Sequence, residues 1–73
     1  MPAFEVIVQH RDGTPAVGAR VALSAVGGGV TQESLSNSRG ATVFTEVSTS
    51  EATVFVNGVK QHITRAGRTV VTI

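Results

Sequence analysis

The chain has 73 residues, which predicts a single domain over residues 1–73, and it contains no cysteine for a disulfide framework or a thiolate metal site. Its net charge of +1, from six basic and five acidic side chains, provides no long-range attraction for nucleic acid or an anionic membrane. We therefore expect neither partner.

Apolar and polar side chains alternate along most of the chain, and helix signals are nearly absent, which predicts short β-strands. The first strand covers residues 4–10, with Phe4, Val6 and Val8 on one face. The turn sequence RDGTP at residues 11–15 ends it, because Asp-Gly favours a tight turn and proline cannot donate a ladder hydrogen bond.

The second strand covers residues 17–26, and its odd-numbered residues are expected to face the core. Gly27, Gly28 and Gly29 follow, and their high backbone entropy predicts a mobile hairpin tip. This triple glycine is a candidate ligand-binding loop. A phosphate-binding role is disfavoured, because neither a helix pattern nor a Gly-Lys-Ser/Thr sequence comes after it.

Five further strands are expected in the rest of the chain. A polar edge strand covers residues 30–37, where Val30 and Leu35 are the few apolar anchors. The Asn57-Gly58 pair is the strongest hairpin signal in the sequence. The remaining strands are expected at residues 41–47, 51–57, 59–64 and 68–73.

Seven short strands at this spacing predict an all-β fold, a small seven-stranded antiparallel β-sandwich. A small, partly open β-barrel has the same periodicity and stays open as an alternative. A chain of this length loses about 1.5 kcal/mol of conformational entropy per residue on folding, so it leaves little surplus stability and must pack well or find a partner.

The succession DGTPAVGARVAL, SNSRGATVF, EATVFVNGVK and AGRTVVTI resembles the transthyretin-like, immunoglobulin-like sandwich of carboxypeptidase regulatory-like domains. The residues that carry this resemblance are Gly13, Pro15, Gly18, Ala19, Val21, Gly40, Thr42 and Phe44. The resemblance implies an accessory, adhesive, structural or carrier module, and such a fold implies no chemistry.

No catalytic, cofactor or metal motif stands out from the sequence. His10 and His62 are the only imidazoles, and no ligand spacing accompanies them. The serines cluster in expected turns and the carboxylates are scattered, so turn chemistry and solubility explain them. The three aromatic residues are phenylalanines in strand centres, which favours core packing over stacking on nucleic-acid bases.

Several strands are apolar on both faces, which indicates that a second surface covers them. If the inner faces are as predicted, Ile7, Phe55 and Val70 form an outer apolar surface, and they are the candidate interface residues. The alternative is that these are scattered surface side chains, which are ordinary in soluble proteins.

The sequence thus predicts a non-enzymatic protein–protein contact module, either a homo-oligomer or a subunit docked on a larger assembly. The alternative is a loop-mediated module for a carbohydrate or peptide, bound by the Gly27–Gly29 loop and the turns at residues 48–50 and 65–67. We find no signal-peptide pattern and no apolar run long enough for a transmembrane helix, and expect a cytoplasmic protein, an excised domain or a particle component.

Overall fold

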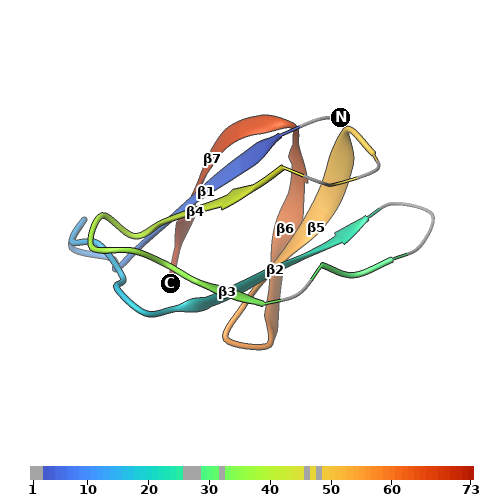
Figure 1. Cartoon of the computed structure of the whole chain (residues 1–73). Coiled ribbons are helices and arrows are strands. Elements are labelled where there is room, and N and C mark those ends of the chain that lie inside the picture. Colours follow the sequence, from blue (N-terminus) through green and yellow to red (C-terminus); the bar gives the residue numbers. More distant parts are fainter. Residues whose placement is uncertain (1–2, 26–28, 32, 46, 48) are drawn as a thin grey trace.

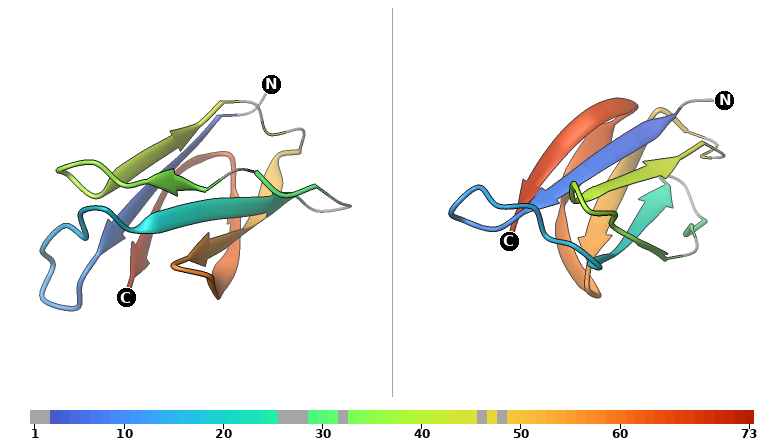
Figure 2. Two further views of the ribbon diagram at one scale, coloured as in Figure 1. Left: turned by 60° about the horizontal axis from the view of Figure 1, so that its bottom comes forward. Right: turned by 60° about the vertical axis from the view of Figure 1, so that its left-hand side comes forward.

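The computed structural model describes residues 3–25, 29–31, 33–45, 47 and 49–73. These residues form two facing β-sheets, and the described part of the chain contains no helix (Figures 1 and 2). No helix that could cross a membrane is therefore found among these residues. The seven strands are β1 (Phe4–Gln9), β2 (Arg20–Ala25), β3 (Ser34–Leu35), β4 (Ala41–Phe44), β5 (Glu51–Val56), β6 (Val59–Arg65) and β7 (Gly67–Thr72).

One sheet has three strands in the order β4-β1-β7, and the other has four in the order β3-β2-β5-β6. The sheets are open, so the prediction of a small β-sandwich is confirmed and the fold is not a closed barrel. Within the described part of the chain, every strand pair is antiparallel except one: β1 and β7 run parallel, with Phe4 beside Gly67 and Gln9 beside Thr72. Periodicity along single strands does not specify which strands become neighbours, so this pair was not predicted.

The sequence resemblance includes immunoglobulin-like sandwiches, so their strand order can be compared with the one observed here. In an immunoglobulin constant domain the four-stranded sheet holds the first, second, fifth and fourth strands. Here the first and fourth strands lie in the three-stranded sheet, where β1 stands between β4 and β7. The order of the strands therefore differs from that of an immunoglobulin constant domain.

The core fills the space between the two sheets. Phe4, Val6 and Val8 are completely buried, while the residues between them are half-buried, as the alternation of the first strand predicts. Each such side chain contributes about 1.5–3 kcal/mol when fully buried. The full cluster contains Phe4, Val6, Val8, Ala16, Ala19, Val21, Leu23, Phe44, Val47, Ala52, Val54, Val56 and Val71.

Three predicted strands are shorter in the structure by more than one residue. The second begins at Arg20, because Gly18 has a φ of +73° and its N–H donates to the carbonyl of Ser36, outside any ladder. Val17, expected on the inner face, is consequently 65% exposed. The polar strand at 30–37 is reduced to the two residues of β3, and the strand at 41–47 ends at Phe44.

The two turns with the strongest sequence signals form as expected. Asn57 and Gly58 both have positive φ angles, 53° and 81°, which is the geometry of the tight hairpin that Asn-Gly favours. In the turn after β1, Asp12 Oδ1 accepts hydrogen bonds from the Thr14 hydroxyl at 2.7 Å and the Thr14 N–H at 3.0 Å. These bonds lower the pKa of the Asp12 carboxyl below its ordinary value of 3.8.

Thr42 places a buried hydroxyl against the core, and that hydroxyl has no hydrogen-bond partner among the described residues. Valine has nearly the same shape and needs no partner. We expect Thr42→Val to raise the free energy of unfolding by about 1 kcal/mol, because it removes the desolvation cost of the hydroxyl. Urea unfolding followed by circular dichroism measures the change.

Thr42→Ser is the matched control for this prediction. It keeps the hydroxyl and removes the methyl group, so it should lower stability by leaving a small cavity. A lower free energy of unfolding for Thr42→Val than for wild type would show that the hydroxyl does make a stabilising hydrogen bond.

Candidate functional site

The outer side of the four-stranded sheet exposes large hydrophobic side chains. Val21, Leu23, Val54 and Val56 point into the core, so the alternate residues of β2 and β5 and their cross-strand partners point outward. We call the outward apolar set the four-stranded face. It consists of Ala22, Val30, Leu35, Phe55 and Ile63.

Each member of this face is placed by strand pairing. Phe55 lies directly opposite Ala22, and Ala22 is only 6% exposed although it points away from the core. Leu35 pairs with Arg20 and Val30 bridges to Ser24, so both stand on the same side of the sheet. Val30 and Leu35 are 70% and 67% exposed, which is unusual for residues that anchor a strand.

Ile63 reaches the four-stranded face through a β-bulge. The pairing of β5 with β6 shifts between Thr53 and Phe55, so that Ile63 lies opposite Thr53 on the outer side. Ile63 is 60% exposed there. A bulge changes the alternation of the residues beyond it, which is why the sequence pattern of residues 59–64 did not identify Ile63 as an outward residue.

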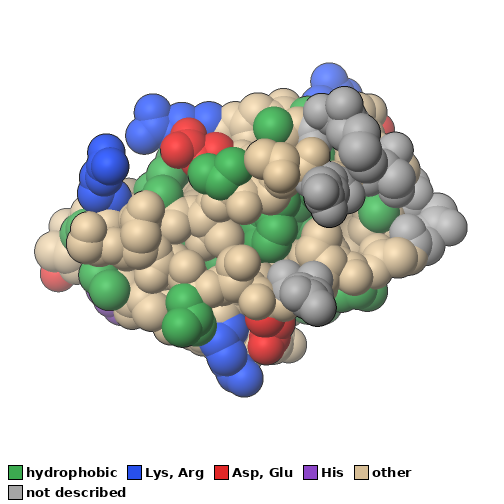
Figure 3. All heavy atoms as spheres, in the orientation of Figure 1, with side chains coloured by type: hydrophobic (Ala, Val, Ile, Leu, Met, Phe, Trp, Pro, Cys, Tyr) green, Lys and Arg blue, Asp and Glu red, His purple; other side chains and the backbone are tan. Residues whose placement is uncertain are grey.

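A hollow of about 350 Å³ lies in the four-stranded face. Its lining consists of Ala22, Ser24, Val30, Thr31, Glu33, Phe55 and Gly58. The lining is mainly apolar, and Glu33 is its one charged member among the described residues. On the side of the molecule that Figure 3 presents, exposed hydrophobic side chains form several groups with charged side chains beside them. The described lining of the hollow therefore offers an apolar contact with one carboxylate among its residues.

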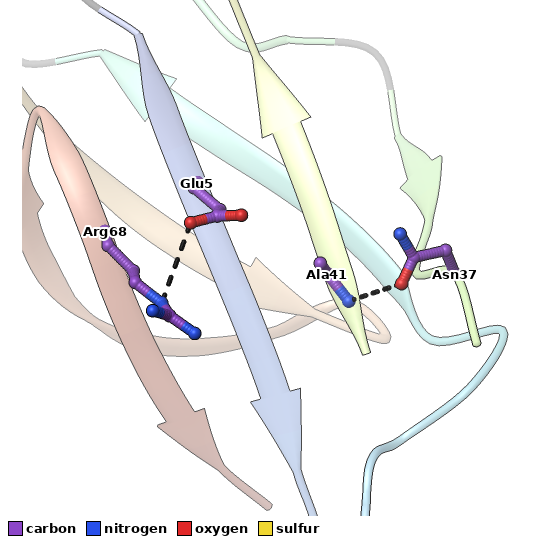
Figure 4. Close-up of polar contacts among 4 residues, drawn as sticks. All are labelled: Glu5, Asn37, Ala41 and Arg68. Carbon is purple, nitrogen blue, oxygen red and sulfur yellow. Dashed lines mark hydrogen bonds and ion pairs between the residues drawn. The ribbon is translucent and has the colours of Figure 1, made fainter. Parts of the chain in front are cut away.

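The three-stranded sheet has an outer apolar row of its own. Ala41, Ile7 and Val70 lie side by side across β4, β1 and β7. Beside this row, Arg68 Nε lies 3.6 Å from Glu5 Oε1, and the Asn37 side chain accepts a hydrogen bond from the Ala41 N–H at 3.0 Å (Figure 4). The ion pair is exposed, so it contributes at most about 1 kcal/mol.

A second hollow, of about 320 Å³, accompanies this row. Its lining consists of Glu5, Ile7, Asn37, Arg39, Ala41, Val43 and Arg68. Two arginines and one carboxylate make it more polar than the hollow in the four-stranded face. This surface combines the apolar row with a charged border.

The structure brings two of the three candidate interface residues together. Ile7 and Val70 are direct cross-strand neighbours in the three-stranded sheet. Phe55 lies on the outer side of the other sheet. The three residues therefore belong to two surfaces on opposite sides of the sandwich.

The three turns of the alternative ligand site emerge at one end of the molecule, as far as they are described. The Ala66 N–H donates to the Ser50 carbonyl at 2.8 Å, and Ala25 pairs with Ala52, so the end of β2 lies beside the start of β5. Gly29 has a φ of +90° and its carbonyl accepts from the Ala25 N–H. Gly27 and Gly28, the rest of the candidate loop, lie outside the described residues.

The residues considered for chemistry do not gather into a site in the described part of the chain. His10 and His62 are both exposed, and His62 Nδ1 lies 3.2 Å from the Ile63 carbonyl. No group of three or more His, Asp or Glu side chains in metal-binding proximity occurs among the described residues. No protein-family model, curated protein or solved structure matches the chain.

Proposed function

We propose that the protein is a non-catalytic structural or protein–protein contact module that docks on a larger assembly through an outer apolar sheet face. The four-stranded face is the observation that carries the proposal. Three large hydrophobic side chains, Val30, Leu35 and Ile63, stand at least 60% exposed on it, and Phe55 lines its hollow. Exposed apolar surface with a polar surround is typical of interaction sites.

The lining of the hollow favours an apolar group on the docking partner. Most of the hollow's exposed lining is apolar, although Ser24, Thr31 and Glu33 also contribute, so it accepts an apolar side chain of the partner better than a charged one. Arg20, Glu33 and Lys60 border the face, and polar partner groups meet them at the rim. Phe55 is the one aromatic side chain in the described lining, and we assign it the largest single contribution to the contact.

The transthyretin-like affiliation is part of the proposal. Seven strands in two layers and the turns at Gly13 and Gly40 support it. Domains of that kind serve as accessory or structural modules, which agrees with a docking role.

A site-specific crosslinking experiment tests the docking face. A photo-crosslinking phenylalanine derivative is placed at Ile63 and the protein is produced in its natural cells. We expect one covalent adduct of defined mass from position 63, and its loss when Phe55→Lys is added. The same derivative at Val43, an exposed residue on the other sheet, is the matched control and should give no such adduct. Equal adduct yields at both positions would contradict the assignment.

The alternative function is recognition of a carbohydrate or peptide at the turn end. The Ala66–Ser50 hydrogen bond favours it, because it fixes two of the three turns beside each other. The chain lacks tryptophan and tyrosine, the usual platforms for sugars, which weighs against a carbohydrate. Ligand-induced amide shifts confined to Gly29, Ser50 and Ala66, with none on the four-stranded face, would favour this alternative.

A further inference from the structure

β7 presents a free edge of unusual regularity. It is the last strand of its sheet, and within the described residues only β1 pairs with it. The Gly67 N–H donates to Ala3 and the Ile73 N–H donates to Gln9. Because alternate residues of a strand turn their backbone groups to the same side, the N–H and C=O groups of Arg68, Val70 and Thr72 point to the free edge.

The other three edge strands carry features that hinder pairing with another chain. β3 has two residues and β4 has four, while β6 is bulged and bears Lys60 and Arg65. Short strands, bulges and edge charges are the usual protections of sheet edges. β7 has six residues without a bulge or proline, and Thr69, Val70, Val71 and Thr72 favour extended strands. Its one charged side chain, Arg68, is engaged with Glu5.

The three-stranded sheet also leaves part of the inner side of the four-stranded sheet uncovered. Val59 of β6 pairs with buried Val56, so its side chain stands on the inner side of the four-stranded sheet. It is nevertheless 60% exposed, because the three-stranded sheet ends at β7. β6 and β7 separate from each other away from their connection (Figures 1 and 2). A strand of another chain that paired with β7 would extend the three-stranded sheet toward the uncovered inner side of β6.

We propose that β7 pairs antiparallel with β7 of a second copy of the chain, with Val70 opposite Val70 of that copy. In this register Arg68 lies opposite Thr72 at both ends, and all three outward-pointing residues of each strand exchange backbone hydrogen bonds. A register centred on Arg68 instead places two like charges opposite each other, which is destabilising. Charge and hydrogen-bond geometry therefore select both the partner's orientation and its register.

The pairing joins two three-stranded sheets into one of six strands. The apolar row formed by Ala41, Ile7 and Val70 then continues through the two-fold axis into the same row of the second copy. This inference concerns an edge in the other sheet from the four-stranded face, so it does not depend on the proposed docking function.

Light scattering coupled to size exclusion tests the pairing with two proline variants. Val70→Pro removes an N–H that points to the free edge and leaves the β1–β7 ladder intact. Val43→Pro makes the same exchange at the free edge of β4 and is the matched control. We expect twice the 7.5 kDa chain mass for wild type and Val43→Pro, and a fall to half of that value for Val70→Pro.

A wild-type monomer at every accessible concentration would overturn the proposal, as would a folded Val70→Pro dimer or the dissociation of Val43→Pro. A cysteine variant keeps the test available if Val70→Pro does not fold. The proposed pair places the two Cα atoms of residue 70 about 5.5 Å apart, within disulfide range, and the chain has no cysteine to compete. Val70→Cys should oxidise to a covalent dimer and Val43→Cys should not, and the reverse result would overturn the register.

The two proposals fail separately. Phe55→Lys alters the four-stranded face alone, so it should abolish the crosslinked adduct while the dimer mass stays unchanged. Val70→Pro should halve the mass while position 63 still forms its adduct.

Discussion

Replacing Gly40 with alanine is expected to lower the free energy of unfolding by about 3 kcal/mol or more. Gly40 has a φ of +76°, a conformation that costs other residues about 1–2 kcal/mol. A Cβ at this position would also overlap the backbone carbonyl oxygen of Val8. Backbone of a central strand cannot move aside as a flexible side chain does, so overpacking adds about 1–3 kcal/mol.

The cost is high because Gly40 joins two parts of the fold. Its carbonyl accepts from the Val8 N–H at 2.8 Å, and its N–H donates to the Asn37 carbonyl at 2.9 Å. A displaced Gly40 therefore disturbs β1 and the turn before β4 together. Urea unfolding of the variant and wild type, followed by circular dichroism, gives the difference in free energy.

Gly13→Ala separates the cost of the backbone conformation from the cost of the Cβ overlap. Gly13 has a similar φ of +89°, but a Cβ there would meet nothing within 4 Å. We expect that control to lose only about 1–2 kcal/mol, the cost of the backbone conformation. Equal losses in the two variants would show that the Val8 carbonyl is not the obstacle.

Ser36→Ala is expected to lower the free energy of unfolding by about 2–4 kcal/mol. The buried Ser36 hydroxyl accepts from the Ala19 N–H at 2.9 Å and donates to the Ala16 carbonyl. Removing it leaves one backbone donor and one acceptor without a partner in the interior, at about 1–3 kcal/mol each. Because Ala16 and Ala19 belong to the core, this hydroxyl helps the backbone hydrogen bonds of Ser36 to hold the segment before β2 in place.

Ser34→Ala provides the comparison in the same segment. Ser34 is exposed on β3, so its replacement should change stability by less than about 0.5 kcal/mol. The same urea experiment measures both variants. A loss in Ser36→Ala no larger than that in Ser34→Ala would contradict the role of the buried hydroxyl.

All seven strands could be predicted from the sequence, because alternation and turn residues act locally. Phe4, Val6 and Val8 show the alternation, and Asn57 with Gly58 shows the turn chemistry. The start of β2 could not be predicted, because hydrogen bonds from the distant Ser36 hold residues 16–19 outside the ladder. Such long-range contacts override a local pattern.

The candidate surface was predicted only in part for a similar reason. Alternation correctly turns Val70 outward and Val71 inward. It does not specify which sheet a strand joins, so it could not show that Phe55 lies on the opposite side of the molecule from Ile7. The bulge that exposes Ile63 likewise depends on the pairing of β5 with β6.

The parallel pairing of β1 with β7 also determines how the domain responds to tension. The chain enters β1 at Phe4 and leaves β7 at Thr72, at opposite ends of the paired strands. A pull between these points runs along both strands, so the hydrogen bonds across six residue pairs are sheared together and share the load. The hairpin of β5 and β6 lies in the other sheet, outside this direct load path. A subunit held in an assembly by its two ends would thus carry force through its first and last strands.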